Sequence, residues 1–429
     1  MPLIQVLKLF TQNRVPGQLI IQMTDHCNAT CPQCGMRVTE KFQRSTLEMD
    51  YIKRLIDAAA AKSFQAISFT GGEPLLFTNK LADLIQYAGQ AGIPYIRTGT
   101  NGFVFRNPNK FNFLKRIHYL AETLAQTPLR NFWISVDSHV DATHEEMRGF
   151  KGVMRGIEKA LPIFHDRGLY PSVNLGINRN VGGDHTRFYA QLANMSDKSY
   201  LDGFENIYYK AFCRFYQRVI DMGFTIANAC YPMSIDVDEG KKGLQAVYPA
   251  SSVDNVVRFS NQEKMRLFKA LMRSIEEYRS KIRIFSPLCS LYALIMDGKQ
   301  DTTAYHANPC RGGIDFFFVD SKDGATYPCG YRGSENMGSF WNIDIKRFAS
   351  KLHTDKCTRC DWECFRDPSE LMDPVLKALR SPIKLLSKWH KLPMARRYWI
   401  QDMRYYRACD FFNGRKSINL LKLARFASN

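Results

Sequence analysis

Long apolar runs and targeting segments are what this sequence lacks. No stretch approaches the ~18 uninterrupted apolar residues of a transmembrane helix. The opening MPLIQVLKLFTQNRVPG also lacks the charged start, apolar stretch and small-residue cleavage site of a signal peptide. Both absences predict a cytoplasmic protein. Thiols stay reduced in that compartment, so the 12 cysteines of this chain indicate metal ligation or catalysis rather than disulfides.

Acidic residues are also in the minority, 41 against 59 lysines and arginines, which gives a formal net charge of +18. Half of this excess lies between residues 369 and 429, where thirteen basic residues stand beside only four acidic ones: Glu370, Asp373, Asp402 and Asp410. A basic balance of this kind favours an anionic partner.

The same C-terminal segment interleaves its basic residues with large apolar ones such as Trp389 and Trp399. One interpretation is peripheral contact with the anionic inner face of a membrane, because tryptophan prefers the interface and long basic side chains reach lipid phosphates. The other is a helical segment that packs on the rest of the chain and leaves its basic face in water. If the first holds, a chain ending near Pro368 is expected to stay in solution and remain active.

Strand and helix patterns alternate through the first half of the chain. Six apolar segments predict strands: 18–23, 64–70, 93–102, 131–137, 171–180 and 223–234. Segments with helical periodicity lie between them: 48–62, 79–91, 110–126, 152–168 and 204–222. Such alternation predicts a parallel sheet with right-handed crossovers. The expected fold is therefore α/β, a partial (β/α)6 TIM-like barrel.

The pattern changes after residue 235. A poorly periodic stretch leads to an amphipathic helix over 261–281, and two short strands around an Asp-Gly turn are predicted within 314–330. The predicted organisation has four parts, listed here in chain order: a core over 16–235, a linker and helix over 236–284, a small cysteine-rich α+β domain over 285–367, and a basic aromatic helical tail over 368–429.

Cys27, Cys31 and Cys34 follow the first predicted strand directly, in the segment CNATCPQC. A [4Fe–4S] cluster normally takes four thiolates, so three on one loop leave one iron open to a small molecule. The loop lies at the carboxyl end of a strand, where parallel barrels place their chemistry. Zinc is the alternative, but it requires a fourth ligand, and His26 is adjacent to Cys27 and poorly placed to supply it.

The cysteine spacing, together with Gly71-Gly72-Glu73-Pro74 at the end of the second strand, resembles the radical S-adenosylmethionine (SAM) superfamily. The two glycines allow close backbone approach to a ligand, and Glu73 can accept a hydrogen bond from its ammonium. The resemblance implies that the open iron of the [4Fe–4S] cluster binds SAM and cleaves it reductively. A 5′-deoxyadenosyl radical then abstracts hydrogen from a substrate. An electron donor such as flavodoxin or ferredoxin is implied as a partner.

Three further residues are similar to family positions near SAM. Asn101, in the TNG turn after the third strand, resembles a polar turn beside the ligand. Ser135, in SVD, and Arg148, in the later RG, resemble a serine and an arginine that contact the SAM amino-acid moiety. Gln33 departs from the family, because the residue before the third cysteine is usually aromatic and packs near the adenine.

A second group of cysteines lies near the end of the chain: Cys310, Cys329, Cys357, Cys360 and Cys364. Its spacing resembles the auxiliary-cluster module called SPASM or, when shorter, twitch. In a full module five residues separate the CxxC pair from the next cysteine, whereas only three separate Cys360 from Cys364. We therefore expect one auxiliary [4Fe–4S] cluster, with four of these five cysteines as ligands in a combination left open. A structural zinc knuckle is the alternative.

These patterns predict an enzyme whose substrate is anionic, with a membrane lipid or lipid-like molecule favoured. A ribosomal peptide is the alternative, although about sixteen residues before the core leave no room for the peptide-binding domain that such maturases often carry there. A third hypothesis is a non-catalytic iron–sulfur or zinc protein that binds nucleic acid through its basic tail. It leaves GGEP unexplained, so nucleic acid is the least expected partner.

Overall fold

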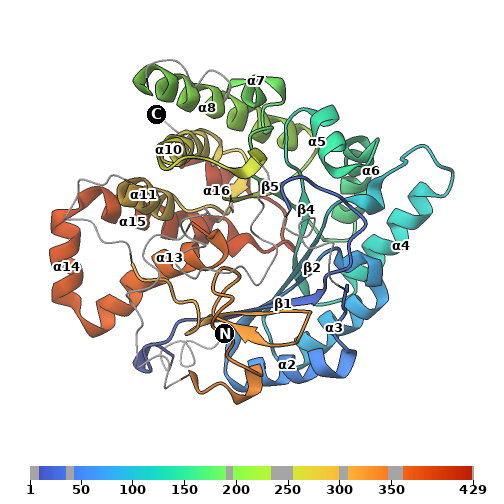
Figure 1. Cartoon of the computed structure of the whole chain (residues 1–429), viewed down its shortest axis with the longest axis horizontal. Coiled ribbons are helices and arrows are strands. Elements are labelled where there is room, and N and C mark those ends of the chain that lie inside the picture. The colour runs from blue at the N-terminus through green and yellow to red at the C-terminus, as the bar shows by residue number, and fades with distance from the viewer. Residues whose placement is uncertain are drawn as a thin grey trace.

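The computed structural model describes residues 9–34, 43–189, 197–232, 255–298, 308–345 and 361–427. Within these residues the strands form one sheet of nine, in the order β7-β6-β5-β4-β3-β2-β1-β8-β9. Figure 1 shows the sheet inside the molecule with helices around it.

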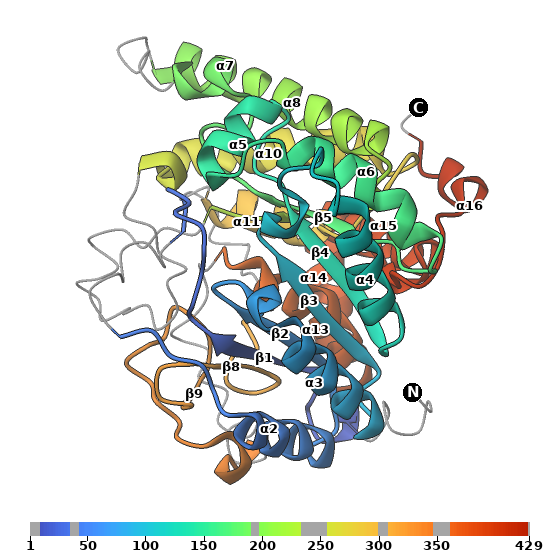
Figure 2. The same cartoon turned by 90° about the vertical axis from the view of Figure 1, so that its right-hand side faces the viewer.

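Strands β1 to β6 are parallel and neighbour one another in sequence order. Their bounds are β1 Gly17–Thr24, β2 Phe64–Gly71, β3 Tyr95–Thr100, β4 Leu129–Ser135, β5 Ser172–Gly176 and β6 Ile226–Cys230. The helices between them are α2 Met49–Ala61, η2 Pro74–Phe77, α3 Thr78–Gln90, η3 Phe103–Phe105, α4 Phe113–Ala125, α5 Asp141–Arg148, α6 Val153–His165, α7 Asp184–Arg187 and α8 Asp197–Asp221. Figure 2 shows α3, α4 and α6 along one side of the strands. The predicted partial barrel is confirmed.

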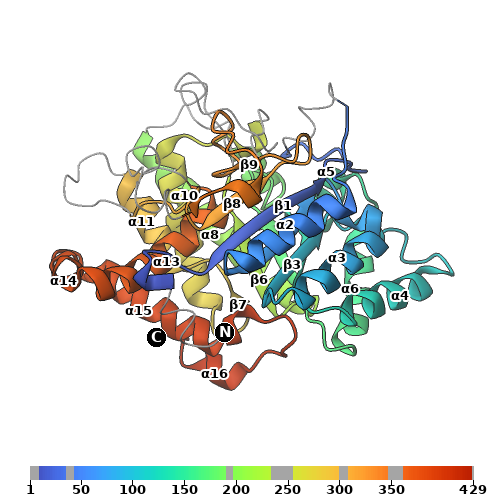
Figure 3. The ribbon, with the colours of Figure 1, turned by 90° about the horizontal axis from the view of Figure 1, so that it is seen from below.

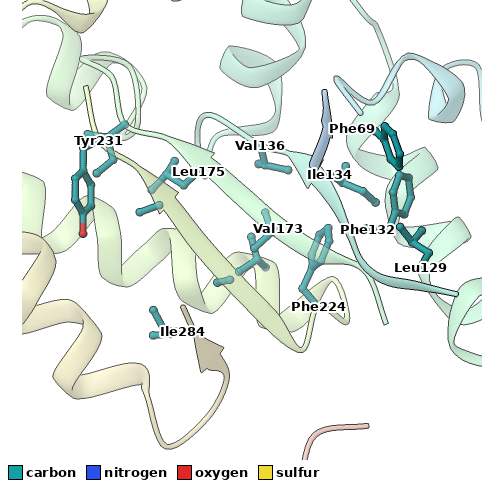
Figure 4. Close-up of a cluster of buried hydrophobic side chains, with 14 of the residues drawn as sticks. Phe69, Leu129, Phe132, Ile134, Val136, Val173, Leu175, Phe224, Tyr231 and Ile284 are labelled. Carbon is teal, nitrogen blue, oxygen red and sulfur yellow. The ribbon is translucent and has the colours of Figure 1, made fainter. Parts of the chain in front are cut away.

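Side-chain alternation along the strands separates an apolar layer from a mostly polar one. Phe132 and Ile134 of β4, and Val173 and Leu175 of β5, are buried in the main apolar core. Figure 4 shows them in that cluster of buried side chains. The residues between them line a cavity inside the barrel: Asn131, Trp133, Ser172 and Asn174.

Three short strands extend the barrel sheet at its two ends. Strand β7 (Arg283–Ile284) pairs in parallel with β6, and β8 (Phe316–Val319) pairs in parallel with β1. Strand β9 (Thr326–Tyr327) returns antiparallel to β8, with Gly324 in the connecting turn at a φ of 69°. The predicted hairpin therefore exists, but its first strand belongs to the barrel sheet because it pairs with β1. There the Phe317 ring packs against Phe64, with 5.9 Å between the ring centroids.

The second half of the chain is mainly helical. Its elements are η5 Asn255–Val257, α10 Asn261–Tyr278, α11 Leu288–Gly298, η6 Phe340–Asn342, α13 Glu363–Arg380, α14 Pro382–Lys391, α15 Pro393–Ala408, η7 Asp410–Phe412 and α16 Leu420–Ala424. Helix α10 begins with the Ser260–Glu263 capping box and matches the predicted helix. Helix α13 contains Pro368 and Pro374, so it runs through the predicted boundary between residues 367 and 368.

The C-terminal segment packs against the barrel. Tyr405 and Phe412 are buried in one cluster with Ile226 of β6, and the Tyr405 hydroxyl donates a hydrogen bond to the Ile282 carbonyl at 2.8 Å. This favours the packed interpretation of the tail over a detached one. A chain ending near Pro368 would lose these contacts, so we no longer expect it to stay folded in solution.

Helix α14 is the exception within this segment, because it projects from the edge of the molecule (Figures 1 and 3). Ile383 and Leu386 on this helix are 82% and 63% exposed, and Leu379 just before it is 56% exposed. Among the described residues, no helix combines the length and apolar character needed to span a membrane.

Candidate functional site

The first cysteine group lies on the loop that leaves β1 at the carboxyl end of the sheet. Cys31 is buried, whereas Cys27 and Cys34 are partly exposed. The Cys34 amide donates to the Cys31 carbonyl at 3.1 Å. Burial raises the pKa of the Cys31 thiol to about 12, against the opposing charge of Arg148. No three His, Cys, Asp or Glu side chains in the described part of the chain are placed to hold a metal ion. Ligation by the three cysteines therefore stays a prediction.

Gly71 and Gly72 pack against the strand end from which the cysteine loop starts. The Gly72 amide donates to the Thr24 carbonyl at 2.8 Å, and the Glu73 amide donates to the His26 carbonyl at 2.9 Å. A Cβ atom on Gly72 would lie 2.2 Å from the His26 oxygen, and one on Gly71 would lie 2.3 Å from the Thr24 oxygen. Contacts with the protein's own backbone therefore already exclude a side chain at either position. Close approach of these glycines to a ligand stays a prediction.

Glu73 connects the ends of β2 and β3. Its buried carboxylate accepts from the Leu75 amide at 3.0 Å and from the Asn101 amide at 2.6 Å. Burial raises the pKa of Glu73 to about 7, although both amides act to lower it. The Asn101 side chain in turn donates to Asn28 Oδ1 at 3.0 Å and contacts Cys27 Sγ at 3.6 Å. The structure thus brings Glu73, Asn101 and Cys27 together.

Asp137, to which the sequence analysis gave no role, organises the end of β4. Arg148 Nε and Nη2 donate to its two carboxylate oxygens at 2.6 and 2.8 Å. Gln33 Nε2 donates to Asp137 Oδ2 at 2.8 Å, so the residue that departs from the family ties the cysteine loop to this carboxylate. Burial alone would raise the pKa of Asp137, but Arg148 and His144 outweigh it and hold that pKa far below its usual range.

Ser135 and Arg148 flank this carboxylate. Ser135 is the last residue of β4 and is partly buried, two positions before Asp137. Arg148 ends α5, and Asp137 holds its guanidinium. The structure places both residues at the same end of the sheet as the cysteine loop, and their contact with SAM stays a prediction.

A cavity inside the barrel collects residues that the sequence analysis did not identify. It is lined by Tyr95, Arg97, Asn131, Trp133, Ser172, Asn174, Ile226, Asn228 and Phe285. The Arg97 guanidinium lies 5.0 Å from the centroid of the Trp133 ring. In the sequence, an arginine within an alternating strand is indistinguishable from a surface residue, so only the fold reveals it.

The second cysteine group is described in part. Cys310, Cys329 and Cys364 share one apolar cluster with Phe316 and Phe365, whereas Cys357 and Cys360 lie outside the described residues. The Gly312 amide donates to Cys310 Sγ at 3.4 Å. The three described cysteines thus gather on one side of the barrel, and their ligation of an auxiliary cluster stays a prediction.

Cys230, at the end of β6, belongs to neither cysteine group in the sequence but lies near the second group in the structure. Asn174 Nδ2 donates to its thiol at 3.1 Å. Burial raises its thiol pKa, as do Glu363 and Cys364 at the start of α13. Nothing in its sequence context indicated this proximity, because residues 230 and 364 meet only through the barrel.

Comparison with known proteins gives the same picture for the core. Residues 21–179 match the family model of the Radical SAM superfamily. A GTP 3′,8-cyclase from Desulforamulus reducens is 28% identical over 188 residues, which are 42% of this chain and 54% of that protein. An Fe-coproporphyrin III synthase from Methanosarcina barkeri is 25% identical over 170 residues, 40% of this chain and 39% of that protein. The chain thus spans about half, or less, of these relatives.

Among solved structures, Streptococcus suis SuiB bound to S-adenosylmethionine shares the fold. It matches with a TM-score of 0.51 and 14% identity over 82% of this chain and 69% of that one. The partial barrel, the strand-end cysteine loop and the family match over residues 21–179 agree with one another. Together they indicate a radical SAM domain over residues 21–179 of this chain.

Proposed function

We propose that Cys27, Cys31 and Cys34 hold a [4Fe–4S] cluster and that SAM binds beside it, at the carboxyl ends of β1 to β4. The observation that carries this proposal is the contact network at these strand ends. Asn101 contacts Cys27 Sγ at 3.6 Å while its own amide donates to Glu73. A segment of the cysteine loop is thereby fixed to the GGEP turn.

The donor set fits this cluster. Three thiols lie on one loop, and Arg148 places a positive charge near Cys31 and Cys34, which opposes the effect of burial on the Cys31 thiol. When bound, the cluster and SAM supply an electron and a 5′-deoxyadenosyl radical that takes hydrogen from the substrate. The protein fixes the geometry: Glu73 joins two strand ends, and Asp137 binds both Arg148 and, through Gln33, the cysteine loop.

For the second cysteine group we propose one auxiliary [4Fe–4S] cluster in a twitch-like module. The grouping of Cys310, Cys329 and Cys364 in one cluster of side chains supports it. Cys357 and Cys360 are the candidates for the remaining ligand. A donor such as flavodoxin or ferredoxin supplies the electrons in this proposal.

The proposed substrate is anionic. The formal charge of +18 supports this, and the similar Desulforamulus reducens protein is named for GTP, a polyanionic nucleotide. Neither relative is named for a lipid, so we retain the anionic character of the substrate and no preference for a lipid over a peptide.

An electron paramagnetic resonance (EPR) experiment tests the cluster and SAM sites together. Anaerobically reconstituted, dithionite-reduced protein should give a [4Fe–4S]⁺ signal that changes when SAM is added, because SAM occupies the open iron. Cys34→Ala should lose the SAM-dependent change. Cys213→Ala, which alters a cysteine on α8 outside both groups, should retain it. A wild-type spectrum that SAM leaves unchanged would contradict the proposal.

Peripheral contact with an anionic membrane is a separate proposal, and α14 is its most suitable element. Exposed Ile383 and Leu386 lie on the same short helix as exposed Lys384 and Lys391. The intact protein should float with anionic liposomes at low salt, and less so at high salt. Ile383→Asp combined with Leu386→Asp should abolish flotation. Equal recovery of this variant and wild type would contradict a role for α14.

A further inference from the structure

The cavity inside the barrel holds a positive charge that the described protein does not neutralise. Arg97, on β3, lines this cavity. Within the described residues its side chain forms no ion pair, and its buried Nε has no hydrogen-bond acceptor. Among the described residues its one ring contact is with Trp133, and none of those that line the cavity is acidic.

Other buried arginines in the described residues have protein partners: Arg283, for example, donates to the Thr225 carbonyl at 3.2 Å. Arg14 pairs with Asp315 at 3.1 Å, Arg279 with Asp402 at 3.0 Å, and Arg366 with Glu370 at 2.9 Å. Pairing is the usual arrangement, because a charge removed from bulk water loses hydration that only an opposite charge or strong hydrogen bonds replace. Arg97 has lost part of its hydration without that replacement, so an anion from outside the described chain is the expected partner.

Gly99 makes room for the Trp133 ring beside Arg97. The Trp133 ring lies against Gly99, where a Cβ atom would come within 2.0 Å of it. The absence of a side chain at Gly99 therefore gives the indole the space in which it meets Arg97.

Asn131, the register neighbour of Arg97 on β4, adds a second donor. Its Oδ1 accepts from the Ser172 hydroxyl at 3.3 Å, which orients the Nδ2 group as a donor, and that group has no acceptor within the described residues. Two adjacent groups that only donate hydrogen bonds, one of them charged, match an oxyanion.

We infer that Arg97 and Asn131 bind an oxyanion group of the substrate, a carboxylate or a phosphate, inside the barrel. The inference rests on the proposed function, because it assigns the cavity to the substrate of that enzyme. Asn101 follows Arg97 by four residues, roughly 13 Å along the strand. A substrate anchored at Arg97 extends from there toward the strand ends at which the cysteine loop lies.

Titration calorimetry on the anaerobically reconstituted full chain tests this site with small probes. Acetate and inorganic phosphate report the two oxyanion classes, and acetamide is the uncharged match for acetate. Wild type should bind acetate, phosphate or both, but not acetamide. Arg97→Met should weaken anion binding at least tenfold. Arg97→Lys, which keeps the charge but loses the planar fork, should give an intermediate affinity.

Arg54→Met is the matched control, since Arg54 is also stacked on a tryptophan, 3.8 Å from the Trp341 centroid, but is exposed. It should bind the probes as wild type does. Equal anion affinity in wild type and Arg97→Met would overturn the inference. Loss of cluster iron from Arg97→Met would also overturn it, because Arg97 would then stabilise the negative charge of an auxiliary cluster rather than bind an anion of the substrate. Anion binding at Arg97 in a protein that cannot cleave SAM would support the site and count against the proposed function alone.

Discussion

At the scale of single residues, Asp137 shows how the candidate site is held. It is fully buried and receives hydrogen bonds from Arg148 on α5 and Gln33 on the cysteine loop. Its neighbour His144 lies 3.6 Å away through Nδ1. One carboxylate therefore connects the end of β4, a helix end and the cysteine loop. Removal of one partner from a buried ion pair destabilises a protein strongly, because the other charge is left without compensation. Asp137 is therefore the residue on which this arrangement depends most.

Asp137→Asn is expected to lower the free energy of unfolding by about 3–5 kcal/mol, since it leaves Arg148 without its charge partner. Asp141→Asn is the matched control. Asp141 also pairs with an arginine, Arg218, but is 43% exposed, so a loss of ~0–1 kcal/mol is expected. Urea denaturation of both variants at neutral pH measures the difference. Equal small losses would show that the Asp137–Arg148 pair contributes little.

The same carboxyl gives a pH dependence. Its pKa is lower in the folded chain than the ~3.9 of an unfolded aspartate, so the unfolded state binds the proton more readily. The stability it contributes is therefore complete above about pH 4 and is lost as the pH falls below that value. Unfolding measured between pH 3 and pH 6 should have a shallower acid slope in Asp137→Asn than in wild type. Identical slopes would contradict the depressed pKa.

Site residues that belong to a short sequence motif could be assigned from the sequence. Residues whose role depends on contacts with distant parts of the chain could not. Cys27, Glu73 and Asn101 were identified by spacing or by their place after a strand, and the structure brings them together. Asp137 and Arg97 were not assigned. Their importance depends on what lies opposite them across the barrel, and sequence periodicity carries no such information.

At the scale of elements, the C-terminal segment holds the end of α4. Arg415 donates to four carbonyl groups at and beyond that helix end, those of Leu124, Ala125, Thr127 and Leu129. The carbonyls of Leu124 and Ala125 are among the last of α4, which a helix end leaves without intrahelical partners. A residue of the predicted tail thus completes a helix of the barrel about 290 positions earlier in the chain.

Arg415→Ala is expected to destabilise the protein by about 2 kcal/mol, because charge-assisted hydrogen bonds are lost and partly buried carbonyls remain unpaired. Lys416→Ala is the neighbouring control. Its ion pair with Asp410 spans 3.3 Å at an exposed position, so its loss should cost under ~0.5 kcal/mol. Urea midpoints of the two variants provide the comparison, and a Lys416 effect as large as that of Arg415 would contradict the capping role.

Most elements of the barrel could be predicted because each helix or strand has its own periodicity. Helix α2, for example, was expected over 48–62 and spans Met49–Ala61. The pairing of β8 with β1 was not predicted, since almost 300 residues separate Gln18 from its partner Phe316. The predicted boundary at Pro368 falls inside α13: the helix continues through Pro368 and Pro374, although a proline removes a backbone donor and usually ends a helix.

At the scale of the whole molecule, the barrel sheet joins the two cysteine groups. Strand β1 leads into the first group, and its parallel neighbour β8 leads through β9 toward Cys329 of the second. Anaerobically reconstituted protein with Cys27, Cys31 and Cys34 all changed to Ala should therefore retain roughly four irons per chain, those of one auxiliary cluster. About eight irons would indicate two auxiliary clusters, and zinc instead of iron would indicate a zinc knuckle.

Reductive cleavage of SAM is the property on which the whole account rests. Reconstituted protein incubated anaerobically with SAM and dithionite should form 5′-deoxyadenosine, which chromatography with mass detection measures directly. Cys27→Ala, Cys31→Ala and Cys34→Ala should each abolish the product, because two thiolates cannot hold the cluster with its open iron, while Cys213→Ala should form it as wild type does. Undiminished 5′-deoxyadenosine from any of the three variants, or none from fully reconstituted wild type, would contradict the account.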